Sequence, residues 1–340
     1  MSIKRAVLFG HTDSHGVTMT AISLRNLLRE GYRVITHCKY VTIQKANSWE
    51  DLPPDCGTSQ PRFFWGQTIV NWDFSQLEKN DIVVTVDIPL PVNEGTQAIF
   101  KDATDRGLLK IKQLIERGIK VFIIDHHEVS KELYSKAREI GANVIFSQSA
   151  VTTHYGIHDE YAEKWGRIGA ISDRDILVLP VTEEEEMLSE GLDGAVRIQR
   201  NKIQEIIELF VEGNEEKIKN YLLQFTGKIP NPQRLEIFDK VVYAGVVDPS
   251  FGFKQLEIAC KKTEKPYAVG INLSRGAAIV IVTYWKSKVP PAAERLKLTN
   301  YIGHPTAPVI PLVSTGRTAT QEEAAFAEAK AREIVRRLET

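Results

Sequence analysis

Short apolar runs alternate with segments of helical periodicity along the first half of the chain. The clearest run, residues 121–124, holds four apolar side chains, three of them β-branched. It is too short for a buried helix and is typical of a strand buried on both faces. Between such runs, apolar residues return at helical spacing, as at Val17, Ala21 and Leu24. This alternation from residue 6 to residue 165 predicts an α/β fold with a doubly wound parallel sheet. The predicted strands are 6–9, 33–36, 81–89, 121–124 and 143–146.

The pattern changes twice in the second half of the chain. Residues 181–236 carry apolar positions at helical spacing and predict a helical connector. Strand patterns return beyond it, and Thr320 with Glu323 forms a capping box before a last helix. We therefore expect a first domain over residues 1–180, the connector over 181–236, and a smaller α/β domain with a mixed sheet over 237–340.

Composition narrows the class of protein further. The 340 residues are 43% hydrophobic and 26% charged, which suits a globular chain with a sizeable core. The net charge of -1 gives no global attraction for a long polyanion, so short or small phosphate substrates are favoured. Three scattered cysteines form neither a disulfide framework nor a zinc ribbon. The sequence shows no signal-peptide pattern and no membrane-spanning run, and we expect a cytoplasmic protein.

Metal-ligating side chains follow three of the predicted strands. The first strand leads into the loop 11–16, the third ends at Asp87, and the fourth runs into the triplet 125–127. Carboxyl ends of parallel strands meet at one edge of an open sheet, where ligands bind. Aspartate and neutral histidine are ligands for divalent metals. The sequence therefore predicts a two-metal site at this edge, with a helix cap in 11–16 and a surface turn at 125–127 as the simpler alternatives. The candidate ligands are His11, Asp13, His15, Asp87, Asp125, His126 and His127.

Two further sites stand outside this strand-end pattern. The small apolar run 168–172 meets Asp173, whose carboxylate suits a metal, a helix cap or a pair with Arg174. In the second half, the turn Gly303-His304-Pro305 presents an imidazole and backbone amides that suit an anion. An ordinary tight turn is the alternative for that segment.

In order and spacing, these motifs resemble those of the DHH phosphoesterase superfamily. The triplet Asp125-His126-His127 is similar to the motif that names the superfamily, and the loop 11–16 resembles the first motif of RecJ-type nucleases. Asp87 and Asp173 fall where the second and fourth motifs end in aspartate, and 303–305 resembles the histidine turn of the accessory DHHA1 domain. The resemblance covers most of the chain and implies a DHH domain followed by a DHHA1-like substrate-binding domain.

The resemblance also implies a role for each matching residue. Asp87 would bridge two Mn²⁺ ions, with Mg²⁺ or Co²⁺ as alternatives, and a hydroxide between the metals would attack phosphorus. Asp125 would orient His126, while His127 would face the scissile phosphate. One metal would be held by His11 and Asp13, the other by His15, His126 and Asp173, and substrate phosphate would be contacted by His304, Gly303 and, more weakly, Arg275.

The function implied by the resemblance is a two-metal phosphodiesterase or exonuclease. Its substrates would be nucleic-acid ends, short single-stranded oligonucleotides or small nucleotides. An inorganic pyrophosphatase and a catalytically weak, RecJ-like binding or scaffold protein of replication or repair remain as alternatives. The motifs leave DNA and RNA, both cleavage polarities, and monomer and dimer all open.

Two positions depart from the family pattern. His15 stands where the family carries aspartate, which removes one negative charge from the site and favours a different metal preference. The turn at 303–304 follows Tyr301-Ile302 rather than a longer glycine run, so fewer backbone amides face a phosphate. These two departures bear most directly on which substrate the chain accepts.

Overall fold

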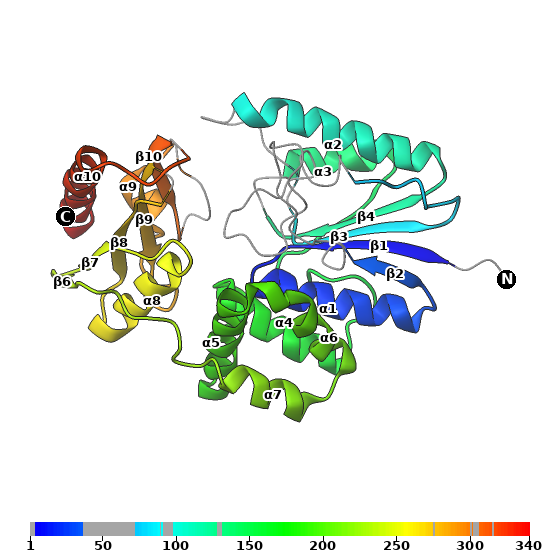
Figure 1. Cartoon of the computed structure of the whole chain (residues 1–340), viewed down its shortest axis with the longest axis horizontal. Helices are drawn as coiled ribbons and strands as arrows, with labels where there is room; N and C mark the ends of the chain where they lie inside the picture. Colours follow the sequence, from blue (N-terminus) through cyan, green and yellow to red (C-terminus); the bar gives the residue numbers. More distant parts are fainter. Residues whose placement is uncertain are drawn as a thin grey trace. The chain divides into compact units, whose positions relative to one another are not determined.

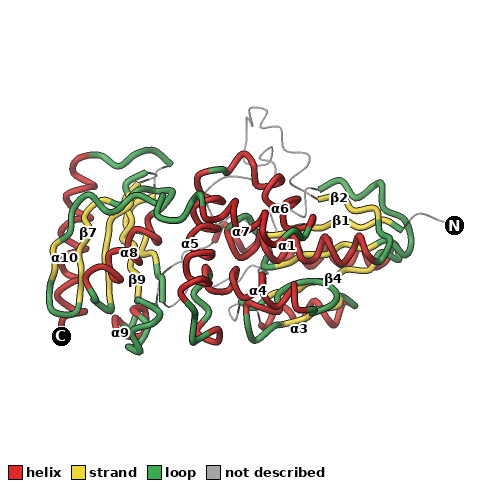
Figure 2. Tube along the Cα trace, turned by 90° about the horizontal axis from the view of Figure 1, so that it is seen from below, coloured by secondary structure: helices red, strands yellow, loops and turns green. Residues whose placement is uncertain are grey.

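The computed structural model describes residues 4–36, 72–88, 90, 98–127, 131–274, 276–299, 301, 306–314 and 316–340. They form two compact units, Met1–Thr226 and Gly227–Thr340. Each unit combines helices with one five-stranded sheet (Figures 1 and 2). Three residues singled out in the sequence, Arg275, Gly303 and His304, lie outside the described part of the chain.

The sheet of the first unit is entirely parallel and has the order β2-β1-β3-β4-β5. This confirms the predicted α/β fold, and each predicted strand is present, although the third spans 82–86 rather than 81–89. The middle strands are continuous apolar runs because helices cover both of their faces. The strands are β1 (Arg5–Gly10), β2 (Arg33–Thr36), β3 (Ile82–Val86), β4 (Lys120–Asp125) and β5 (Asn143–Phe146).

Helices pack on both faces of this sheet (Figure 1). One face carries α2 (Ala98–Glu116) and α3 (Lys131–Ile140), and the other carries α1 (Ser14–Arg29) with α4 (Glu160–Ser172) packed against it. Three helices follow within the same unit, where α6 contacts α1 and α5 contacts α4. They are α5 (Glu183–Ile198), α6 (Ile203–Glu212) and α7 (Glu215–Leu223).

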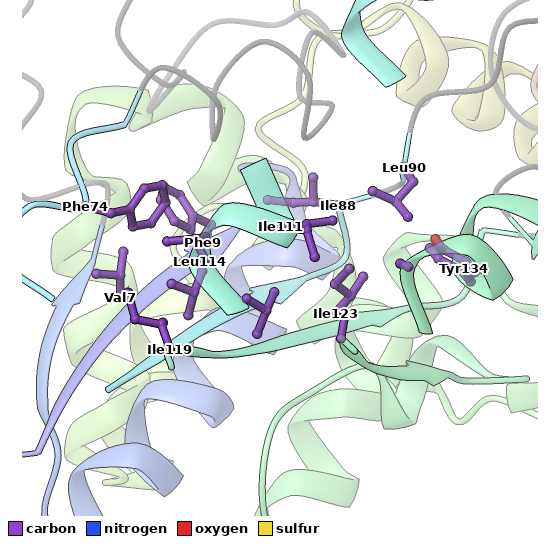
Figure 3. Close-up of a cluster of buried hydrophobic side chains, with 14 of the residues drawn as sticks. Val7, Phe9, Phe74, Ile88, Leu90, Ile111, Leu114, Ile119, Ile123 and Tyr134 are labelled. Carbon is purple, nitrogen blue, oxygen red and sulfur yellow. The ribbon is translucent and has the colours of Figure 1, made fainter. Parts of the chain in front are cut away.

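Alternate residues of the strands divide the core of the first unit into two layers. Val7, Val83 and Val121 face α2 and α3 in one buried cluster, where Ile111 and Tyr134 come from the helices (Figure 3). Intervening residues such as Ala6, Leu8, Val84 and Ile124 are also buried, and strand alternation points them to the opposite face, on the α1 side. Burial on both faces fixes the register of the strands, and with it the place of each strand's carboxyl end.

The strand order reverses beside β1, because β2 lies on one side of it and β3 on the other. In open α/β sheets, such a reversal leaves a crevice outside the strand ends where ligands bind. The segments that leave β1, β3 and β4 at this edge begin with His11, Asp87 and His126. The topology therefore brings the three ligand-bearing segments to one place.

Two helix boundaries differ from the sequence prediction. The segment from Ser149 to about residue 164 has a sequence typical of one capped helix, and this prediction is wrong. Ser149 caps only the short 3₁₀ turn η4 (Ala150–Thr152), and α4 begins later, behind the cap Asp159. Helix α1 begins at Ser14, so His15 lies in its first turn rather than in an extended loop. A single Asx or Ser cap signal does not reveal whether a 3₁₀ turn or a long helix follows it.

The second unit is a mixed sheet in the order β10-β9-β8-β7-β6 with helices on both faces. Helix α10 (Gln321–Glu339) opens with the predicted Thr320–Glu323 capping box and packs on one face, while α8 (Gly252–Thr263) packs on the other. Among the described residues, none of the helices is long and apolar enough to cross a membrane. The remaining elements are β6 (Glu236–Ile237), β7 (Val241–Val246), β8 (Tyr267–Asn272), β9 (Gly276–Thr283), α9 (Ala292–Leu296) and β10 (Val309–Ser314).

Close packing of α4 on α1 depends on Gly169. A Cβ atom there would lie 2.1 Å from the Thr18 hydroxyl oxygen and 3.5 Å from the Cα of His15. We expect Gly169→Ala to lower the free energy of unfolding by about 1–3 kcal/mol, because the extra methyl group forces the helices apart. Urea unfolding measures this change, and Glu163→Ala on the exposed side of α4 is the control. Equal stability of the two variants would contradict this packing.

Candidate metal centre

The Asp87 carboxylate is the centre of a buried cluster at the carboxyl edge of the first sheet. Asp87 directly follows β3, its backbone N–H donates to the Ile124 carbonyl, and its side chain is 2% exposed. Its φ of 58° lies in the left-handed region, which aspartate tolerates better than most residues. Backbone conformations of this kind persist where the surrounding structure enforces them, often at functional sites.

Three imidazoles surround this one carboxylate. His15 Nδ1 lies 3.1 Å from Asp87 Oδ2, and His11 Nδ1 lies 3.6 Å from the same oxygen. His126 Nε2 lies 3.2 Å from the other oxygen, Oδ1. Both oxygens of Asp87 therefore face nitrogen atoms from different segments, as a carboxylate shared between two cations would.

Asp13 has two functions that the sequence analysis treated as alternatives. Its Oδ1 accepts a hydrogen bond from the backbone N–H of Gly16 at 2.8 Å and so caps α1. Its Oδ2 lies 2.8 Å from His11 Nδ1 and faces the cluster. The helix cap thus fixes the carboxylate so that its second oxygen remains directed at His11.

His126 joins the cluster to α4. Its Nε2 lies 3.4 Å from Asp173 Oδ2 as well as close to Asp87. Asp173 is the C-terminal cap residue of α4, and its backbone N–H donates to the carbonyl of Gly169. The helix end therefore sets the position of a carboxylate that the sequence analysis left undecided between a metal ligand and a cap.

Asp125 contacts a different histidine from the one expected. The sequence analysis expects Asp125 to orient His126, but its Oδ1 lies 2.6 Å from His127 Nδ1. Its Oδ2 accepts a hydrogen bond from the hydroxyl of Tyr134 on α3. Burial lowers the pKa of His127, but the charge and hydrogen bond of Asp125, together with the charges of Asp87 and Asp173, raise the pKa to about 9. His127 is therefore held by a Tyr134–Asp125 pair beside the cluster.

Tyr134 is a site residue that the sequence analysis missed. It is 1% exposed and belongs to the apolar core beneath α3. A tyrosine on the apolar face of a helix ordinarily indicates packing, so its hydroxyl gave no functional signal in the sequence. Its contact with Asp125 becomes visible only when α3 is docked on the sheet.

The donor atoms fall into groups that fit divalent cations. Atoms bound to one ion at about 2.0–2.2 Å lie about 3.0–3.6 Å apart when they are neighbours around it. The N···O separations around Asp87 and Asp173, 3.1 to 3.6 Å, match this spacing. Three groups of donors lie mutually within 4.8 Å, and they are His11–Asp13–Asp87, His15–His126–Asp173 and Asp87–Asp125–His126–His127.

Buried charge dominates the electrostatics of the cluster. Burial lowers the pKa of His15, but the Asp87 carboxylate raises it to about 10. In the same way, Asp13 and Asp87 raise the pKa of His11 well above its usual range against the effect of burial. Burial raises the pKa of Asp87, yet the charge of His15 and hydrogen bonds with the histidines around it together hold the pKa well below its usual range. Without a cation, protons on His11 and His15 therefore help to balance the buried carboxylates.

Neither a family model nor a curated protein sequence matches this chain. Among solved structures, a manganese-bound RecJ exonuclease is 14% identical with a TM-score of 0.41, over 99% of this chain and 89% of its own. RecJ of Thermus thermophilus with Mn²⁺ is 12% identical with a TM-score of 0.42, over 99% of this chain and 51% of its own. This chain thus spans about half the length of that protein.

An uncharacterised protein of Helicobacter pylori is 10% identical with a TM-score of 0.29, over 99% of this chain and 100% of its own. Such low identities and TM-scores decide nothing about the activity of this chain. Its function must therefore be argued from its own residues.

We expect divalent metal to bind in exchange for protons. At about pH 7 the metal-free cluster holds protons on His11 and His15, and a metal ligand must be deprotonated. Addition of Mn²⁺ to metal-free protein should release protons, and the affinity should rise from about pH 6 to about pH 8. Calorimetry in buffers of different ionisation enthalpy measures the number released. An affinity for Mn²⁺ that does not change with pH would contradict this exchange.

Proposed function

We propose that this chain is a metal-dependent phosphoesterase that hydrolyses phosphodiester bonds of nucleic-acid ends, short oligonucleotides or small nucleotides. The observation that carries the proposal is the single buried carboxylate of Asp87, which faces His11, His15 and His126. The order of the sequence motifs, which resembles that of the DHH superfamily, supports the same reaction class.

The donor set suits two divalent cations. His11, Asp13 and Asp87 would hold one, and the second would be held by His15, His126 and Asp173 together with Asp87. When bound, two such ions supply positive charge for the attacking and leaving oxygens of a phosphoester. Mn²⁺ accepts both carboxylate and imidazole ligands, and it is the cofactor we propose.

His127 is the proposed phosphate-facing group. Its Nδ1 hydrogen-bonds to Asp125, so Nε2 is the ring nitrogen through which it would donate to a phosphate oxygen. With a pKa of about 9 in the metal-free cluster, the ring carries its proton at neutral pH, as a donor or general acid must. Asp125 fixes the ring orientation, and Tyr134 fixes Asp125.

The charge of the whole chain supports a short substrate. Proteins that hold long nucleic acids through many phosphate contacts carry a marked excess of lysine and arginine. Here 43 lysines and arginines stand against 44 acidic residues. The proposed substrate is therefore a short single strand or a small nucleotide, held mainly at the metal centre.

Hydrolysis of a substrate panel tests the proposal. The panel holds short oligonucleotides, long single strands, cyclic dinucleotides and pyrophosphate, each with Mn²⁺ and with Mg²⁺. We expect Mn²⁺-dependent release of nucleoside monophosphate, fastest from the short substrates. Hydrolysis of pyrophosphate alone would identify a pyrophosphatase instead. Bound Mn²⁺ without hydrolysis of any substrate would contradict the proposal and favour a binding protein.

Asp87→Asn should abolish both metal binding and activity. Asparagine keeps the size of the side chain and tolerates the left-handed backbone, so the fold should remain. Loss of the shared carboxylate should lower kcat/KM by more than about 100-fold and reduce the bound metal. Metal content and hydrolysis are measured on the same sample, with Asp105→Asn on the exposed surface of α2 as the control. Full activity of Asp87→Asn would refute the assigned centre.

Tyr134→Phe should separate positioning from metal binding. Removal of the hydroxyl leaves Asp125 Oδ2 without that hydrogen bond and loosens His127. We expect kcat to fall by roughly 10-fold, while the metal content and KM change little, because Tyr134 acts through Asp125. Steady-state kinetics and metal analysis give the two readouts. An equal loss of bound metal would instead assign Tyr134 a purely structural role.

A further inference from the structure

The tautomer of the neutral His15 ring is set by a backbone contact far away in the sequence. His15 Nε2 lies 2.8 Å from the carbonyl oxygen of Ala150, and a carbonyl oxygen can only accept a hydrogen bond. Nε2 therefore carries the hydrogen, and the lone pair of the neutral ring is on Nδ1. A metal-ligating histidine typically donates its other ring N–H to a backbone carbonyl in this way.

The surroundings of His15 hold the ring in this orientation. Its side chain is 1% exposed, and its backbone carbonyl accepts from the Thr18 hydroxyl at 2.7 Å. The backbone N–H of Ala150 donates to Asp175 Oδ2 at 2.9 Å, which fixes the turn that presents the Ala150 carbonyl. The imidazole therefore has little freedom to rotate away from the cluster.

The second ring nitrogen, Nδ1, faces the Asp87 carboxylate, which is also a hydrogen-bond acceptor. It lies 3.1 Å from Asp87 Oδ2, and it makes no hydrogen bond of normal geometry with the described residues. A lone pair and a carboxylate oxygen at this distance repel each other unless a proton or a metal cation lies between them, and the proton of the metal-free protein is the one that a bound metal would replace. His15 Nδ1 is thus placed to bind a metal ion together with the other donors.

The two metal positions consequently differ in their donors. One group holds a single imidazole and two carboxylates, from His11, Asp13 and Asp87. The other holds two imidazoles and one carboxylate, from His15, His126 and Asp173, and its two rings stand edge to face with centroids 5.0 Å apart. Only the second position is rich in nitrogen.

Nitrogen donors change which cation a site prefers. Mg²⁺ binds oxygen ligands, demands near-ideal octahedral geometry and gives up its water reluctantly. Imidazole suits Zn²⁺, Fe²⁺ and their neighbours in the first transition row, which bind nitrogen more tightly along the series from Mn²⁺ toward Cu²⁺.

We infer that His15 makes the His15–His126–Asp173 position selective for a first-row transition cation over Mg²⁺. This inference rests on the metal-dependent function proposed above and concerns the identity of the cofactor. It assigns to His15 a role in selectivity that an aspartate at this position would not provide.

Competition between Co²⁺ and Mg²⁺ tests the inference by binding alone. Metal-free protein is dialysed against Co²⁺ with rising Mg²⁺, and the bound ions are counted by elemental analysis. We expect wild type to retain one Co²⁺ per chain at millimolar Mg²⁺. In His15→Asp, the ratio of the Mg²⁺ and Co²⁺ dissociation constants should fall by about 10-fold or more. His158→Asp, at an exposed histidine outside the cluster, should leave the ratio unchanged. An unchanged ratio in His15→Asp would overturn the inference.

A second measurement is made on the wild-type protein and does not depend on a variant that adds a charge to the site. In protein labelled with ¹⁵N at histidine, Zn²⁺ should move the Nδ1 resonance of His15 to the metal-bound range and leave Nε2 protonated. The resonance is assigned by its absence in His15→Asn. A His15 Nδ1 resonance that ignores Zn²⁺ would refute ligation. Neither measurement uses hydrolysis, so a failure of the proposed reaction would not be mistaken for a failure of this inference.

Discussion

The buried carboxylate of Asp87 is the constraint on which the rest of the site depends. A negative charge that is 2% exposed is strongly unfavourable unless positive charge and hydrogen bonds compensate it. The fold meets this need from three directions, through His11 after β1, His15 in α1 and His126 after β4. Protons can balance the charge in the metal-free protein, and divalent cations can replace them. The same electrostatics that raise the pKa values of His11 and His15 therefore favour metal binding.

The triplet at the carboxyl end of β4 makes two separate sets of contacts. His126 turns its Nε2 toward Asp87 and Asp173, within the group of metal donors. His127 instead pairs with Asp125, whose second oxygen accepts from Tyr134. Neighbouring residues after a strand point in different directions, so one imidazole can hold metal while the next is kept for substrate. With these contacts, the proposed binding of the cofactor would fall to His126 and the proposed transfer of a proton to His127.

The strand patterns of the sequence predicted much of this arrangement. Each apolar run ends where the strand leaves the core, and parallel strands bring their carboxyl ends to one edge of the sheet. The sequence alone therefore located Asp87 and the 125–127 triplet on that edge. Contacts between distant segments could not be predicted in this way. The carbonyl of Ala150 fixes the ring of His15 across 135 positions, and the hydroxyl of Tyr134 reaches Asp125 only after α3 docks. Likewise, an aspartate that caps a helix and one that belongs to a polar cluster look alike in sequence, and Asp13 both caps α1 and faces His11.

The central claim is that two cations share the Asp87 carboxylate. Anomalous diffraction from crystals soaked in Mn²⁺ tests it most directly, because it locates each ion independently of any activity. We expect two manganese peaks that flank Asp87, one beside His11 and Asp13 and the other beside His15, His126 and Asp173. A crystal with manganese bound elsewhere and no peak within ligand distance of Asp87 would contradict the claim.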